Sequence, residues 1–423
     1  MLLFAYLAVV AGCASRGGPG VATPADPDTD LAIYETHVTV EPEHASLTAR
    51  STLRYRATKA TASRATLLLN RALSVQSVAG PSVRSFKVTA SELSPLWNLI
   101  EVELDGTAPG EVVTLHMTYD GRPEFSSDAI NGISTSWVEL NVDSQWHPIA
   151  STFDLEMIGD VHITLPTGWQ VLGSGQVETS GLTHVIRNRI PQVDVAFVAA
   201  PSFEQASAGA FTVHFRKASR MTAAAVLQAA GNCGAYLNER YGARAPLPDA
   251  TLVLADREGP GYARKNFIVL SEVNPADKEG LHQFLCHELT HYWTLSAGAF
   301  SPDHWMTEAF AEYVAARYIR DHVDRAAFDR RRLQWEAGGR AHGPVWTPES
   351  TARPSYFVMY RKAPYLLSTL EDKIGTERMS SFIERYLSGR VRTTTQLLKH
   401  LETVAGLETS DWFRARLAEK PPG

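Results

Sequence analysis

The sequence predicts an α+β multidomain protein, in which an antiparallel β domain precedes a mixed α/β domain. Residues 31 to about 201 form short alternating runs broken by turn residues, for example His37–Val40, Thr52–Tyr55 and Val112–His116, and alternation with a period of two is typical of half-buried strands. After residue 209 the pattern changes, and Met221–Tyr241 is predicted to form an amphipathic helix. We therefore expect a β domain over 31–203 and a second domain over 204–423.

Length and composition set the broad class of the protein. The chain has 423 residues, of which 44% are hydrophobic and 20% charged, and its formal net charge is −6. This length is sufficient for two or three domains with their own cores. The sequence contains no basic run or stripe, so we expect no nucleic-acid partner.

The first thirty residues have the character of a targeting segment. Residues 1–12 are apolar and end in Val10-Ala11-Gly12-Cys13, which resembles a bacterial lipobox, and they are too short to span a membrane. We expect 1–12 to be a signal peptide, Cys13 to carry a lipid, and the Gly- and Pro-rich residues 13–30 to form a flexible tether. The protein would then face the periplasm of a bacterial cell envelope, held to the membrane by that lipid alone. An ordinary secretory signal is the alternative.

Two further cysteines, Cys233 and Cys286, lie in predicted helices with apolar neighbours. Free cysteine is among the most buried residue types. We expect two buried free thiols rather than a disulfide.

The segment His287-Glu288-Leu289-Thr290-His291 matches the H-E-x-x-H pattern. Residues i and i+4 lie on one face of a helix, so both imidazoles can bind one metal ion, while Glu288 lies beside the metal and can accept a proton from water. A catalytic zinc site needs a third protein ligand, for which Glu308 is the candidate. The sequence therefore predicts one Zn²⁺ ion held by His287, His291 and Glu308.

The surroundings of the motif favour this interpretation over two surface histidines on an ordinary helix. Phe284, Leu285, Leu289 and Trp293 give the helix an apolar stripe. Glu312 follows Glu308 by four residues and is placed to support a ligand histidine from behind.

The same segment resembles the aminopeptidase N-type gluzincin zinc metallopeptidases. In that family the zinc motif is followed by W-L-N-E-G-F-A, to which Trp305-Met306-Thr307-Glu308-Ala309-Phe310-Ala311 is similar. Positions 292–307 place sixteen residues between His291 and Glu308, where the family usually has eighteen, and a shorter loop accounts for the difference. The resemblance implies a thermolysin-like catalytic domain over 204–423 and no large C-terminal helical domain.

The resemblance also implies roles for residues outside the zinc motif. Glu139 lies nine residues before Pro148, as in the family, where this glutamate binds the α-amine of the substrate. Gly259, Gly261 and Tyr262 occupy the place of the family's G-A-M-E-N segment, an edge strand for the substrate backbone, with Tyr262 where a second amine-binding glutamate would fall. Tyr360 resembles the tyrosine that stabilises the oxyanion.

These features together predict a zinc peptidase that acts on peptides and releases N-terminal residues. Two alternatives stay open, an endopeptidase with the same chemistry and a non-catalytic zinc lipoprotein that binds peptides. We do not assign His147, His282 or His304 as ligands, since a histidine near a metal site is more often structural, and His282 lies off the ligand face of the helix.

Overall fold

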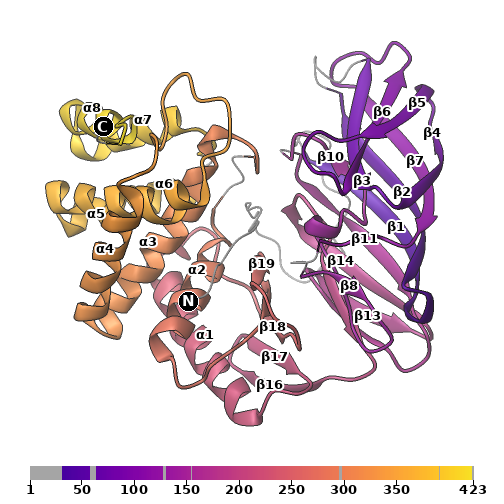
Figure 1. Ribbon diagram of the computed structural model, residues 1–423, viewed down its shortest axis with the longest axis horizontal. Coiled ribbons are helices and arrows are strands. Elements are labelled where there is room, and N and C mark those ends of the chain that lie inside the picture. Colours follow the sequence, from indigo (N-terminus) through magenta and orange to yellow (C-terminus); the bar gives the residue numbers. More distant parts are fainter. Residues whose placement is uncertain are drawn as a thin grey trace. The chain divides into compact units, whose positions relative to one another are not determined.

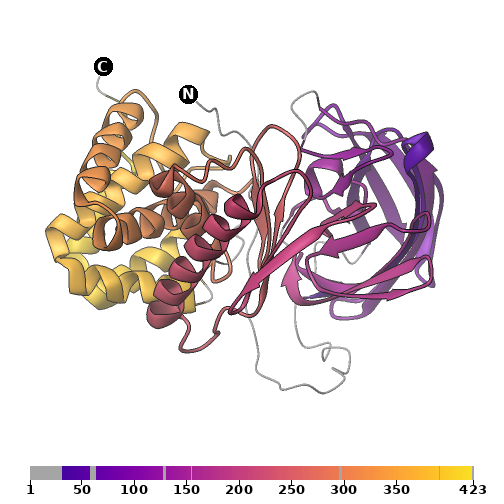
Figure 2. The same ribbon diagram turned by 90° about the horizontal axis from the view of Figure 1, so that it is seen from below.

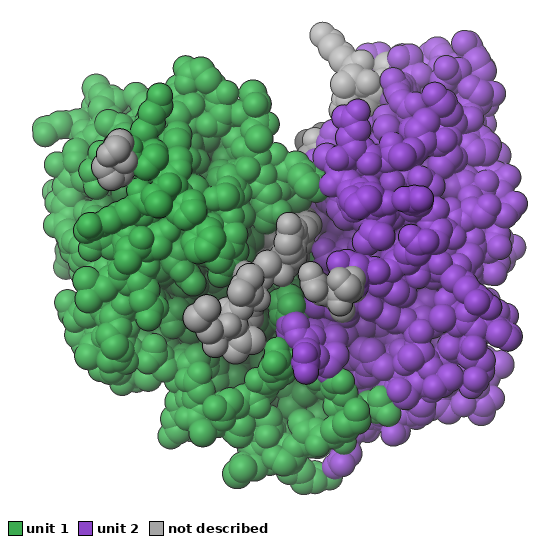
Figure 3. All heavy atoms as spheres, viewed as in Figure 1, with its two compact units in different colours: residues 1–15, 205–256, 260–423 green, residues 16–204, 257–259 purple. Residues whose placement is uncertain are grey.

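The computed structural model describes residues 31–57, 63–126, 130–153, 155–294, 298–389 and 391–421. The predicted signal peptide, Cys13 and the tether therefore lie outside the described residues. The chain forms two compact units, which Figure 3 shows in different colours. We call the described residues of 16–204 and 257–259 the β unit, and those of 205–256 and 260–423 the α/β unit.

The β unit contains three sheets. A seven-stranded sheet has the order β13-β14-β11-β1-β2-β7-β4, and two four-stranded sheets have the orders β10-β3-β6-β5 and β12-β15-β9-β8 (Figure 1). The strands are β1 Ala32–Glu41, β2 Ser46–Arg56, β3 Arg64–Asn70, β4 Leu73–Ala79, β5 Val83–Ala90, β6 Trp97–Leu104, β7 Val112–Gly121, β8 Gly132–Ile133, β9 Val138–Leu140, β10 Ile149–Ala150, β11 Met157–Thr164, β12 Gln170–Gly173, β13 Gln176–Ser180, β14 Thr183–Gln192 and β15 Phe197–Ala200.

Strand β1 shows why the alternating pattern produces this sheet. Its side chains alternate between buried and accessible along its whole length, so one face of the strand packs on the core. The expected domain was antiparallel, and β1 does pair antiparallel with β2, but it pairs parallel with β11 on its other side. A parallel pair needs a long crossover connection, which short-range alternation does not reveal.

The α/β unit is built on a five-stranded sheet with the order β16-β17-β18-β20-β19. Strands β17, β18 and β20 are parallel, and β19 runs antiparallel to β20 at the edge. All side chains of β20 are buried, as expected for a parallel strand inside a sheet. The strands are β16 Glu204–Ala208, β17 Phe211–Phe215, β18 Ala250–Leu254, β19 Tyr262–Arg264 and β20 Phe267–Leu270.

Helices complete this unit and lie to one side of its sheet (Figure 2). They are α1 Arg220–Tyr241, α2 Lys278–Thr290, α3 Trp305–His322, α4 Arg325–Gly339, the π-helical turn η4 Val358–Lys362, α5 Ala363–Ile374, α6 Thr376–Ser388, α7 Thr394–Ala405 and α8 Leu407–Leu417. Helix α3 is buried over most of its length and packs on α2, α4 and α5. Within the described parts of the chain, no helix has the length and apolar character needed to cross a membrane.

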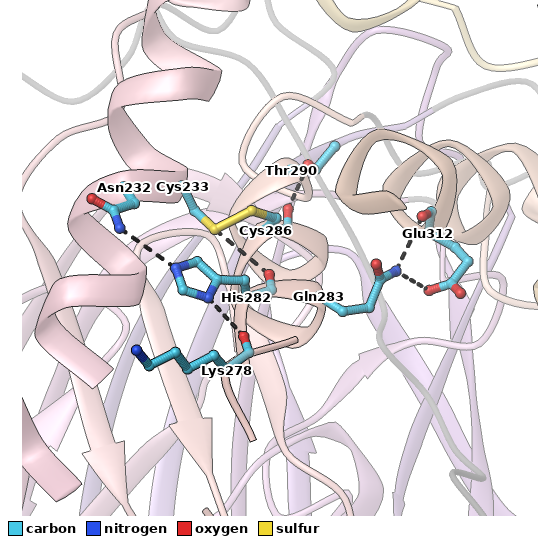
Figure 4. Close-up of a disulfide and its surroundings, with 8 residues drawn as sticks. All are labelled: Asn232, Cys233, Lys278, His282, Gln283, Cys286, Thr290 and Glu312. Carbon is cyan, nitrogen blue, oxygen red and sulfur yellow. Dashed lines mark hydrogen bonds between the residues drawn. A yellow bond between two sulfur atoms is a disulfide. The ribbon is translucent and has the colours of Figure 1, made fainter. Parts of the chain in front are cut away.

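The two cysteines of this unit form a disulfide, so the expectation of free thiols was wrong. Cys233 of α1 and Cys286 of α2 have Cα atoms 5.1 Å apart and a bond of 2.06 Å between their sulfur atoms (Figure 4). The pairing follows from the packing of α1 on α2, which brings together residues 53 positions apart. Burial among apolar neighbours is compatible with either a thiol or a disulfide, and sequence alone does not show which helices pack together.

Candidate active site

Helix α2 and its C-cap residue, His291, place the two motif histidines one turn apart. The helix begins after Asp277, whose Oδ1 accepts a hydrogen bond of 2.8 Å from the backbone N–H of Gly280, a common way to cap a helix. The imidazole rings of His287 and His291 lie 4.8 Å apart between their centroids, and both residues are buried.

The third predicted ligand comes from the first turn of α3. Glu308 Oε2 lies 3.5 Å from His287 Nε2 and 3.7 Å from His291 Nε2. Ligand atoms bound tetrahedrally at 2.0–2.1 Å from zinc are about 3.4 Å apart, so this spacing fits zinc. His291 Nε2 is buried and has no hydrogen-bond partner among the described residues, as expected for a nitrogen that binds a metal. The structure therefore brings His287, His291 and Glu308 together in a geometry that fits one divalent cation.

Glu312, one turn further along α3, supports His287 from the opposite ring nitrogen. Its Oε2 lies 3.5 Å from His287 Nδ1. Gln283 of α2 donates a hydrogen bond of 2.9 Å to the same oxygen, as Figure 4 shows, and Trp335 of α4 donates one of 3.2 Å to Oε1. Burial would raise the pKa of Glu312, but the hydrogen bond to His287 and the charge of Arg331 lower it to about 2. The carboxylate is therefore ionised and orients the imidazole.

Glu308 has a further neighbour that sequence reasoning left out. His304 is fully buried, and its Nε2 lies 3.5 Å from Glu308 Oε1. Burial would raise the pKa of Glu308, but the charge of His291 and the hydrogen bonds to His287 and His304 hold it well below its usual range. The four-residue separation between His304 and Glu308, typical of neighbours on a helix face, is the signal that points to this contact.

Glu288 lies beside the predicted ligands with the properties of a general base. It is buried, and its Oε2 has no hydrogen-bond partner among the described residues. Burial raises the pKa of Glu288 to about 7, and a nearby cation would lower it again. A carboxylate whose pKa lies near neutrality can both accept and return a proton.

Two buried cations, one at the end of β19 and one directly after it, were also missed. Arg264 and Lys265 directly follow Ala263, and both are almost completely buried. Lys265 Nζ donates a hydrogen bond of 3.2 Å to the carbonyl oxygen of Tyr292. The charge of Arg264 lowers the pKa of Glu288, so part of the negative charge of the site is compensated from the sheet.

Tyr360 reaches the predicted ligands from the π-helical turn η4. Its hydroxyl donates a hydrogen bond of 2.5 Å to Glu308 Oε2, and its ring stacks on His287 with 5.9 Å between centroids. Single π-helical turns occur frequently at functional sites. The turn packs tightly on α4, because a Cβ atom on Gly339 would lie 2.8 Å from Lys362 Cα.

The segment predicted to align substrate has a structural role as well. Strand β19 is the edge strand of its sheet, as expected, and Tyr262 is buried. A Cβ atom on Gly261 would lie 2.5 Å from the carbonyl oxygen of Val269 and 2.6 Å from the ring of Phe284. Gly261 therefore permits α2 to pack closely on β19, which helps to position the zinc motif.

Glu139 belongs to the β unit, and its carboxylate already has strong partners. The residue is fully buried on β9. Arg257 donates hydrogen bonds of 2.8 Å from Nε to Oε2 and 2.7 Å from Nη2 to Oε1, and Trp137 Nε1 donates a third of 3.0 Å. Gly259 lies two residues after Arg257 and has a φ of +90°, which favours glycine. The bidentate pair balances the charge of Glu139.

The fold, with a β unit followed by an α/β unit, is that of the two-domain M1 zinc metallopeptidases. The M1 zinc metallopeptidase from Deinococcus radiodurans superposes with a TM-score of 0.68 at 20% identity, over 93% of this chain and 95% of that one. Yeast LTA4 hydrolase in complex with bestatin superposes with a TM-score of 0.72 at 15% identity, over 96% of this chain and 72% of that one. No protein-family model and no curated protein matches the sequence. The expected fold class is confirmed, and at these identities the likeness establishes the fold.

Proposed function

We propose that the protein is a zinc-dependent metallopeptidase that hydrolyses peptide bonds. The observation that carries this proposal is the convergence of His287, His291 and Glu308, with Glu288 beside them in the same buried site. A bound zinc ion would polarise the substrate carbonyl and lower the pKa of a water molecule.

The protein's own groups supply the proton transfers. Glu288 accepts the proton of the attacking water and then returns it to the leaving nitrogen of the cleaved bond. Tyr360 stays neutral because burial and the charge of Glu308 raise its pKa well above the usual value. Its hydroxyl is therefore able to donate a hydrogen bond to the oxyanion. That hydroxyl donates to Glu308 Oε2, so it lies within reach of a group bound at the ligands.

For substrate preference, the proposal is an aminopeptidase. Crystal structures with this fold include a mutant M1 zinc metallopeptidase bound to a Tyr-Ser-Ala substrate, with a TM-score of 0.69 and 19% identity, and another bound to L-arginine. The family resemblance of the sequence implies that the segment with Gly259, Gly261 and Tyr262 would contact the peptide backbone and that Glu139 would bind the α-amine.

One observation favours an endopeptidase as the second candidate. Both oxygens of Glu139 accept hydrogen bonds from Arg257. A substrate amine would have to displace a bidentate guanidinium from a buried carboxylate, and the displaced guanidinium would lose its partner. In addition, Tyr262 occupies the place of the second amine-binding glutamate of the family that the sequence resembles.

A cleavage assay separates the two candidates. Peptides with free or acetylated N-termini are incubated with the protein, products are identified by mass spectrometry, and Glu288→Ala serves as the control for contaminating activity. Loss of single N-terminal residues from the free peptides alone supports an aminopeptidase, and internal cuts in both sets support an endopeptidase. No cleavage above the control would contradict the peptidase and favour a peptide-binding protein.

For location, we propose a bacterial cell envelope, with the protein anchored through a lipid on Cys13. The disulfide between Cys233 and Cys286 supports an oxidising compartment, because disulfides are rare in the reducing cytosol. In a bacterial host, the unmodified protein is expected in the membrane fraction and Cys13→Ser in the soluble fraction. Equal distribution of the two would contradict the anchor.

A further inference from the structure

A second cluster of metal-binding side chains lies in the β unit. Glu35 and His37 are two residues apart on β1, so their side chains lie on the same face of the strand. His37 pairs in parallel register with His162 of β11, and Figure 1 shows these two strands side by side. The strand pairing therefore brings all three side chains to one place on the large sheet.

The distances within this cluster are compatible with a shared ligand. Glu35 Oε1 lies 3.3 Å from His37 Nε2. The rings of His37 and His162 are stacked, with 4.3 Å between centroids and 11° between planes. One ligand atom from each of the three residues lies within 4.8 Å of the others. Because the side chains of His37 and Glu35 are 45% and 57% exposed, they are free to rotate toward a common cation, and a cation in solution has access to them.

The stacking of the two rings disfavours two imidazolium ions at this place. Protonated rings stacked at this distance would repel each other. Burial and the charge of His37 lower the pKa of His162, which leaves its lone pair available near neutral pH. The nearby carboxylate of Asp160 has a smaller effect on the pKa of His162. This carboxylate pairs with Arg187 at 2.8 Å and with Arg189 at 2.7 Å.

We propose that Glu35, His37 and His162 form a second transition-metal site, which takes Zn²⁺ or Cu²⁺. Two imidazoles and one carboxylate are ligands that suit these ions. The strand register places the three side chains next to one another. Rotation of these side chains has to bring their ligand atoms from within 4.8 Å to about 3.4 Å of one another. The site shares no ligand with the one on α2 and α3, so it does not depend on the proposed peptidase activity.

The test is metal stoichiometry on the whole protein. The protein is dialysed to equilibrium against buffered micromolar Zn²⁺, and zinc per chain is measured by plasma mass spectrometry. We expect two equivalents for the unmodified protein and one for the double variant His37→Gln/His162→Gln. His291→Ala, which removes a ligand of the other site, should retain the β-sheet equivalent, and combining all three changes should remove both.

A matched control separates this site from general histidine binding. His116 is an exposed histidine on β7 of the same sheet and hydrogen-bonds to Thr52, so His116→Gln should retain two equivalents. A Cu²⁺ electron paramagnetic resonance spectrum of His291→Ala should show coupling to two nitrogens, lost in the combined variant. A zinc content of the double variant equal to that of the unmodified protein would overturn the proposal. Unchanged thermal unfolding of the double variant excludes misfolding as the cause of a lost equivalent.

Discussion

The two histidine–glutamate clusters of this chain use the same ligand types and differ in their surroundings. His287, His291 and Glu308 are buried, and Glu312 and His304 contact them from behind. Glu35 and His37 are about half exposed and lie on a sheet surface. Buried groups that cannot bond to water keep a fixed orientation and a strong interaction with a bound cation. The comparison teaches that ligand type permits metal binding, whereas burial and supporting groups adapt a site for catalysis.

The largest expected effect is on turnover and follows from loss of the proposed general base, for which the exposed cluster has no counterpart. Glu288→Ala removes the proposed general base, so kcat should fall by about 10²–10⁴-fold, while zinc content stays that of the unmodified protein. Peptide turnover and zinc analysis check this together. Turnover equal to that of the unmodified protein would contradict the role of Glu288.

The next effect concerns the anchoring of the helix that carries the buried cluster. The disulfide joins α2 to α1 across 53 residues, and losing such a cross-link typically costs 2–5 kcal/mol of stability. Cys233→Ser/Cys286→Ser should therefore lower the thermal unfolding midpoint of the α/β unit.

Mild reduction of the unmodified protein provides the comparison for the cysteine variant. It should give the same shift in the unfolding midpoint. A midpoint unaffected by either treatment would show that the packing of α1 on α2 holds the helix without the bond.

Removing the charge of Glu312, which contacts the ligand His287, is expected to have a smaller effect, on metal affinity. Glu312→Gln keeps the shape of the side chain and removes the charge that orients His287, so zinc affinity should fall by about 10–100-fold. Competition with a chelator measures it. Glu377→Gln is the matched control, because Glu377 is an exposed residue in the first turn of α6. Equal affinity in the two variants would rule out this role for Glu312.

A third histidine environment differs from both clusters in its effect on the pH dependence of stability. His147 is buried, and its Nε2 lies 2.8 Å from the hydroxyl of Thr36 and 3.2 Å from that of Ser51. Burial lowers the pKa of His147 to about 3 from a usual value near 6.5. The unfolded chain therefore binds a proton that the folded chain does not, and stability falls as pH drops from about 6.5 toward 3, by up to about 1.4 kcal/mol per pH unit.

The pH effect is measured as the difference between two proteins, because other groups also titrate. Denaturant unfolding of the unmodified protein and of His147→Gln at several pH values isolates the contribution of this histidine. The variant should be less stable near pH 7 and show a weaker loss of stability on acidification. Parallel pH profiles would contradict the assignment.

The predicted residues that the structure brings together share short-range spacing. His287 and His291 are separated by one helical turn, and the placement of Glu308 after them follows from the resemblance of a continuous segment. Alternation along β1 likewise indicated a half-buried strand. Each of these inferences needs only the geometry of one element or of two consecutive ones.

The features that were missed depend on contacts between distant segments. Cys233 pairs with Cys286 because α1 packs on α2, and Arg257 neutralises Glu139 from 118 positions away. Local patterns contain no information on such pairings. His304 is the exception, since its spacing from Glu308 was readable, and it was set aside because most histidines near a metal site are structural.

The parallel pairing of β1 with β11 has a kinetic consequence. Strand β1 ends at Glu41 and its partner β11 begins at Met157. During synthesis, more than a hundred further residues must therefore be added before these two strands can pair in the middle of the seven-stranded sheet. Contacts between such distant segments are slow to form, because chain entropy is lost before the contacts compensate it. Until then β1 has only the hairpin with β2, and its other edge is open to pairing with another chain.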